Sequence, residues 1–134
     1  MKSLLIFLLL MMTGGFAAFS QSQGELNKQA AQEYKDADKK LNEIYQLILK
    51  DYAANKTFIQ NLKDAQRLWI QFRDAQVKAM YPASAKSYGS VFPMCKANYL
   101  AELTHQRTDA LRAWLNGLPQ GEVCTGSIGD KEDH

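Results

Sequence analysis

Apolar residues recur every three or four positions along three long segments of this chain, which is the spacing of one face of an α-helix. The segments cover about residues 25–52, 58–80 and 90–116. Pro82 ends the second segment because proline lacks a backbone N–H, and Gly117 follows the third where a helix C-cap is expected. No strand-like alternation is present. The pattern predicts an all-α fold, a three-helix bundle made of a long antiparallel helical hairpin and a third helix.

Charged residues interrupt these apolar stripes. Arg107 comes two helical turns after Leu100 and so lies within the stripe of the third segment, while Arg73 lies at the edge of the second. A buried guanidinium needs an acceptor. One interpretation is that Arg107 or Arg73 pairs with Asp38 or Asp74 and fixes the helix register; the other is that an arginine binds a ligand. We favour pairing, because arginine pairs are common in small bundles.

The first 20 residues have the features of a secretion signal. Lys2 supplies a positive charge, residues 4–12 are all apolar, and Ala18 and Ser20 place small residues before a cut at Gln21. The alternative is an uncleaved anchor, but the apolar run is shorter than the roughly 20 residues that span a bilayer. No later segment is apolar enough to cross a membrane. We therefore expect a periplasmic or secreted protein, cleaved near Ser20/Gln21.

Two cysteines, Cys95 and Cys124, follow this signal. In an oxidising compartment such a pair predicts a disulfide. A metal site lacks further ligands at suitable spacing, and His105 is too far along the helix from Cys95 to activate a nucleophilic thiol. We therefore expect a helical domain over residues 21–117, and a flexible tail over 118–134 that is anchored at Cys124.

Charge and residue pattern exclude several functions. The chain has 16 Lys and Arg against 14 Asp and Glu, a net charge of +2, so it has no strong field for nucleic acid. No paired carboxylates, Ser/His pair or phosphate-binding glycine loop occurs at useful spacing. We therefore expect no enzyme activity, no cofactor and no metal site.

Several stretches, in order, carry a resemblance to a known family. They are AQRLWIQFRD at 65–74, ADKKLNEIY at 37–45, Gly-Ser at 89–90, Cys95, and LTHQRT at 103–108. Together they resemble the LprI-like family of lysozyme inhibitors. The resemblance implies a small exported helical domain and lysozyme as a protein partner. The residues of these stretches to which we give a structural role are Asp38, Trp69, Arg73, Asp74, Gly89 and Arg107.

The chain departs from the family at Gln29 and Val77, where members usually carry cysteines. If those two cysteines form one bridge in relatives, their joint loss removes a cross-link from the hairpin. The departure does not change the expected fold.

If the protein is an inhibitor, its binding residues should be exposed and lie on a loop. The connection between the second and third helices combines tyrosines with serines and a lysine, which suit protein interfaces. Its candidate partner-binding residues are Tyr81, Ser84, Lys86, Ser87 and Tyr88. The alternative function is an envelope interaction or structural module whose partner is not lysozyme.

Overall fold

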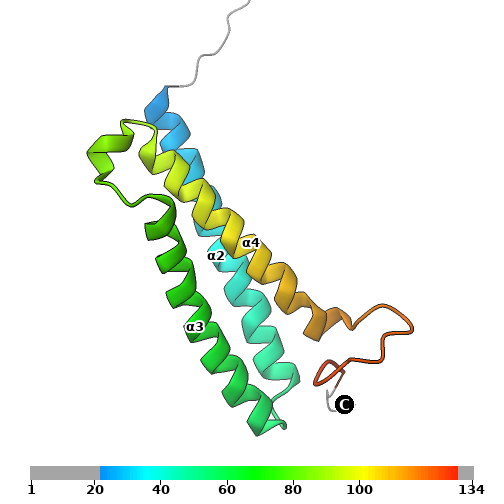
Figure 1. The fold of residues 1–134 in the computed structure, drawn as a ribbon. Helices are drawn as coiled ribbons and strands as arrows, with labels where there is room; N and C mark the ends of the chain where they lie inside the picture. Colours follow the sequence, from blue (N-terminus) through cyan, green and yellow to red (C-terminus); the bar gives the residue numbers. More distant parts are fainter. Residues whose placement is uncertain (1–21, 130–134) are drawn as a thin grey trace, which may run out of the picture.

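The structure, a computed structural model, describes residues 22–129 as three long α-helices and one short 3-10 helix. Helix α2 covers Gln23–Asp51, α3 covers Lys56–Met80, the 3-10 helix η1 covers Ala85–Tyr88 and α4 covers Phe92–Asn116. Helices α2 and α4 run side by side in the same direction, and α3 runs antiparallel to both (Figure 1). The prediction of an all-α fold with three helices is confirmed, and the predicted bounds are close to the observed ones.

Local capping explains where the helices begin and end. The Ser22 hydroxyl accepts a hydrogen bond from the Glu25 N–H at 3.2 Å and so caps the first turn of α2. At the start of α3 the cap is Asn55, whose side-chain oxygen accepts from the Phe58 N–H at 3.0 Å. Helix α4 ends at Gly117, whose φ of 78° lies in the left-handed region that favours glycine.

Helices α2 and α4 make the closest helix–helix approach, and small residues allow it. The facing positions over much of their length are alanines and threonines rather than large side chains. They are Ala30, Ala37, Ala97, Ala101, Thr104 and Thr108, all buried. Thr104 and Thr108 satisfy their hydroxyls by donating to the carbonyls of Leu100 and Thr104, one turn back. Polar residues therefore fit this seam without an unpaired group.

The large apolar side chains gather toward the other end of the bundle, near the turn between α2 and α3. This hydrophobic cluster consists of Leu41, Ile44, Ile48, Tyr52, Leu62 and Leu111. Phe58, Trp69 and Trp114 are partly buried and pack around it. Helix α3 lies farther from α4 than α2 does, and few of its backbone atoms come close to α4.

The buried face of α3 differs from the expected one. Three- and four-residue steps from Phe58 through Leu62, Ala65, Trp69 and Phe72 predict that all five pack inward, but Ala65 and Phe72 are exposed, and Phe72 retains 56% of its surface. The positions turned inward include Gln66, which is 7% exposed, and Arg73. Two polar residues thus lie on the buried face of α3. The helix is therefore rotated about its axis, relative to the orientation that its apolar residues alone indicate.

The predicted disulfide between Cys95 and Cys124 is wrong: both cysteines are free. Cys95 lies in the first turn of α4, and Cys124 lies beyond its last residue. The helix from Cys95 to Asn116 is about 32 Å long at 1.5 Å per residue. The residues from 117 to 124 would have to run almost fully extended back along α4 to close the bridge.

The tail instead folds against the end of the bundle from which it emerges (Figure 1). The Ser127 hydroxyl accepts a hydrogen bond from the Trp114 indole N–H at 3.1 Å. The Tyr52 hydroxyl donates to the Trp114 carbonyl and accepts from the Gly129 N–H, both at 3.0 Å. These bonds, rather than Cys124, anchor the tail.

The predicted signal segment, with its cut near Ser20/Gln21, lies outside the described residues, as do the last five residues of the tail. Within residues 22–129, no helix is both long enough and apolar enough to cross a membrane.

Candidate functional site: the loop between α3 and α4

The loop between α3 and α4 is an ordered turn of chain at one end of the bundle (Figure 1). Pro82 prevents α3 from continuing, and η1 follows over Ala85–Tyr88. Gly89, with φ 72°, then reverses the chain toward α4. The Asn27 side chain donates to the Ser90 carbonyl at 3.2 Å and ties the loop to the first turns of α2.

An aromatic cluster supports this loop from beneath. The ring of Tyr81 lies edge-on to those of Tyr88 and Phe92, with centroids 5.4 and 5.3 Å away, and Tyr99 lies 6.4 Å from it. Tyr88 stacks on Phe92 at 5.2 Å. Its hydroxyl accepts a hydrogen bond from the Ala83 N–H at 2.9 Å. Burial raises the pKa of the Tyr81 hydroxyl above its ordinary value.

The five loop residues expected to bind a partner therefore divide into two groups. Tyr81 and Tyr88 are half-buried and hold the loop together. Ser84, Lys86 and Ser87 are exposed, and the two serine hydroxyls lie 3.1 Å apart in a mutual hydrogen bond. The loop thus presents a small polar tip with one cation on a rigid aromatic base.

Four of the residues expected to have a structural role form one cluster on α2 and α3. The Arg73 guanidinium lies 2.9 Å from the Asp74 carboxylate and 3.8 Å from that of Asp38. It also lies 5.4 Å from the centre of the Trp69 ring and 6.0 Å from that of Tyr34. This cluster links α2 to α3, as the pairing interpretation expects.

Arg107 does not follow that interpretation. Its Nε donates to the side-chain oxygen of Gln66 at 3.0 Å, and no carboxylate among residues 22–129 pairs with it. Gln66 was not identified from the sequence, because the position of a glutamine among apolar residues does not indicate which residue its side chain will bond. The only available signal was its position, one turn after Leu62 and within one turn of Trp69.

In the described range, no three His, Cys, Asp or Glu side chains come together as metal ligands would. His105 lies 3.1 Å from the Glu33 carboxylate, and both side chains are largely exposed, so this contact links α2 and α4 at the surface.

The architecture is that of a small all-α protein with an ordered loop at one end of its three helices. The family model described as "Lysozyme inhibitor LprI" matches residues 17–111, which is most of the chain. The chain therefore belongs to the LprI lysozyme inhibitor family. It is 38% identical over 103 residues to the uncharacterized protein R02472 of Rhizobium meliloti (strain 1021), covering 68% of this chain and 72% of that protein. No solved structure matches the chain significantly.

Proposed function

We propose that this protein is an exported, non-catalytic inhibitor of lysozyme that binds at the substrate cleft of the enzyme. The observation that carries the proposal is the family match over residues 17–111. The N-terminal segment, with its apolar run and small residues before Gln21, supports export to the compartments where lysozymes act.

The loop between α3 and α4 is the part of the molecule best suited to enter a cleft. It caps one end of the bundle, and its aromatic base and its bond to α2 fix its shape before binding. A pre-ordered loop loses little conformational entropy when it binds. Inhibition by such a loop requires no chemistry from the inhibitor, only occupation of the site.

The exposed tip has groups that suit the interior of a glycosidase cleft. Such clefts carry a pair of carboxyl groups on either side of the scissile bond. The Lys86 ammonium can pair with an ionised carboxylate, and the Ser84 and Ser87 hydroxyls can donate to carboxyl oxygens. We expect these three side chains to provide the specific contacts and the tyrosines beneath them to provide rigidity.

The test is a lysis assay in which purified mature protein is added to several types of lysozyme. Loss of hydrolysis at stoichiometric amounts, for at least one type, is the expected result. The matched variants are a triple change of Ser84, Lys86 and Ser87 to alanine and a control Lys63→Ala, an exposed lysine on α3 away from the loop.

The triple variant should inhibit at least tenfold more weakly, equal to about 1.4 kcal/mol of binding free energy, with unchanged helix content. The Lys63→Ala control should inhibit like the parent. Full inhibition by the triple variant would exclude the loop as the contact. If no lysozyme type responds to the parent, the inhibitor function is refuted, leaving an envelope module with another partner.

A further inference from the structure

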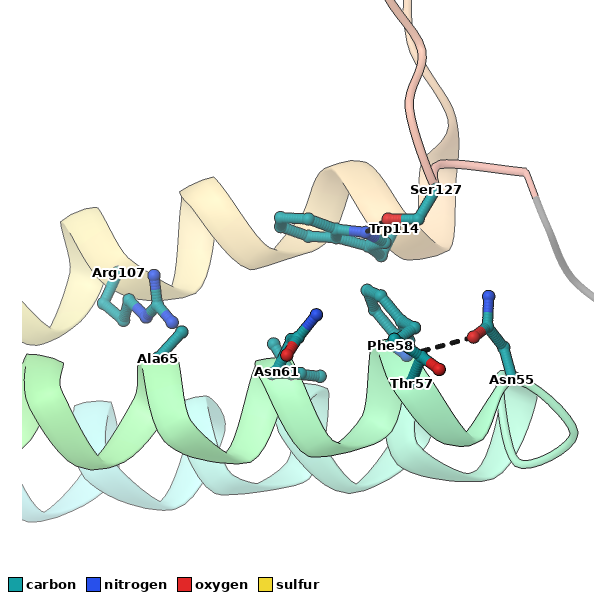
Figure 2. A pocket seen from close by; sticks show the side chains of 9 residues that line it. Asn55, Thr57, Phe58, Asn61, Ala65, Arg107, Trp114 and Ser127 are labelled. Carbon is teal, nitrogen blue, oxygen red and sulfur yellow. Dashed lines mark hydrogen bonds between the residues drawn. The ribbon is translucent and has the colours of Figure 1, made fainter.

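A second feature lies at the opposite end of the bundle from the loop. A pocket of about 440 Å³ opens between α3, α4 and the tail, within the size range of small-molecule sites. Figure 2 shows Arg107 at one end of it, Phe58 and Trp114 facing one another at the other, and Asn61 between them. The described residues that line it are Asn55, Thr57, Phe58, Asn61, Leu62, Ala65, Arg107, Trp114 and Ser127.

We propose that this pocket binds a small amphipathic organic anion, whose acidic group pairs with Arg107 and whose apolar body lies against Phe58 and Trp114. The inference is independent of lysozyme inhibition, because the pocket is lined by the first half of α3 and the last part of α4, whereas the loop follows the end of α3 and precedes the start of α4.

The charge balance of the pocket calls for an anion. Among the described arginines, Arg67, Arg73 and Arg112 each pair with a carboxylate, whereas Arg107 bonds only the neutral amide of Gln66. The described lining contains no acidic residue. Arg107 is half-buried, so its positive charge has lost part of its hydration without gaining a counter-charge. An anionic group there can form a charge-assisted bidentate hydrogen bond.

The guanidinium remains able to make that bond. Its Nε is used by Gln66, at 3.0 Å. No buried side-chain nitrogen or oxygen in the described residues lacks a hydrogen-bond partner. The terminal nitrogens of Arg107 are therefore either bonded or open to solvent, and they donate to no other residue within 22–129. They face the pocket as available donors.

The other end of the pocket is apolar and aromatic. The Phe58 and Trp114 rings have centroids 6.0 Å apart at an angle of 39°, and Phe58 also packs on Tyr52 at 4.7 Å. Arg107 and Trp114 are seven residues apart on α4, about 10 Å along the helix axis. A ligand that reaches both must be about as long as two joined aromatic rings. The Asn61 amide lies between the two ends and can bond a polar group midway.

A pair of fluorescent probes tests this inference on the full mature chain. Anilinonaphthalene sulfonate has an aromatic body of the required length and one anionic group, and N-phenyl-naphthylamine is the same body without the sulfonate. Titration should give saturable binding of the sulfonate at one site per chain, followed by probe emission and by quenching of tryptophan emission. Binding that does not saturate would overturn the proposal.

Two pairs of variants locate the site. Arg107→Gln should weaken the sulfonate at least tenfold and leave the neutral probe within about twofold, while Arg112→Gln, on the same helix but paired with Asp109, should change neither. Ala65→Phe, which fills the pocket from its exposed wall, should weaken both probes, and Ala75→Phe, exposed on the same helix outside the pocket, should not.

Far-UV circular dichroism of each variant checks that it is folded. If Arg107→Gln does not fold, the Ala65→Phe and Ala75→Phe pair decides the location of the site. Equal sulfonate affinity in the parent and in a folded Arg107→Gln variant would refute the assignment of Arg107. Undiminished binding of both probes by Ala65→Phe would show that they bind elsewhere.

Discussion

Replacement of Arg73 by alanine tests how a charged residue on the buried face of α3 contributes to stability. The Arg73 side chain is only 12% exposed, although it carries a full charge. It contacts two carboxylates, Asp74 at 2.9 Å and Asp38 at 3.8 Å, and two aromatic rings, Trp69 at 5.4 Å and Tyr34 at 6.0 Å. The alanine variant removes all four contacts together.

The expected loss follows from these contacts. Each cation–π contact contributes about 0.5–1 kcal/mol even where it is exposed to solvent. The two ion pairs add up to about 1 kcal/mol, because the Asp38 and Asp74 side chains are 45% and 55% exposed and stay hydrated without a partner. Lost packing of the aliphatic stem adds to this. Arg73→Ala should therefore lower the free energy of unfolding by about 2–3 kcal/mol. This is less than the cost of removing one member of a fully buried ion pair.

Urea unfolding followed by circular dichroism at 222 nm measures this change. The matched control is Arg67→Ala on the same helix, whose side chain is 65% exposed and pairs with Asp64 at 3.2 Å; its cost should be under about 0.5 kcal/mol. Arg73→Lys should fall between parent and alanine, because it keeps the charge and loses the planar stacking. Arg73→Ala within about 0.5 kcal/mol of the parent would refute the reasoning, and a lysine variant as stable as the parent would show that stacking is unimportant.

Two further predictions concern the cysteines and the tail. Cys95 and Cys124 should both react as free thiols in denatured, unreduced protein, and a reducing agent should leave the melting temperature unchanged. In the folded protein Cys124 should react faster than Cys95, because Cys124 is exposed. Absence of reactive thiols would contradict the structure. Tyr52→Phe removes a hydroxyl with two hydrogen bonds, so it should cost about 1–2 kcal/mol and speed hydrogen exchange at the Gly129 amide. Tyr45→Phe, at a partly buried position of α2, should leave that exchange rate unchanged.

The position of the loop between α3 and α4 could be predicted from the sequence, but its internal arrangement could not. Pro82 and Gly89 mark a loop by their own backbone preferences, and the structure has an ordered loop there. From the sequence alone, all five candidate residues of that loop carry equal weight. Only the packing of Tyr81 and Tyr88 on Phe92 separates the supporting residues from the exposed ones.

The helices themselves are determined locally, which is why the sequence predicts them well. The three- and four-residue spacing, the Ser22 cap and Gly117 all act within a few residues of the helix they define. The sequence-based family resemblance rests on the same kind of short, ordered stretches, and the family match confirms it.

Only the tertiary structure decided which face of α3 is buried and which groups meet across the bundle. Gln66 and Arg73 lie inside because their polar groups find partners on other helices, Arg107 on α4 and Asp38 on α2, and a single-chain pattern does not contain those partners. The same holds for the cysteines. The presence of two cysteines indicates a disulfide, but about 32 Å of helix lies between Cys95 and the end of α4. The tail stays at that end of α4, because Tyr52 and Trp114 provide its hydrogen bonds there.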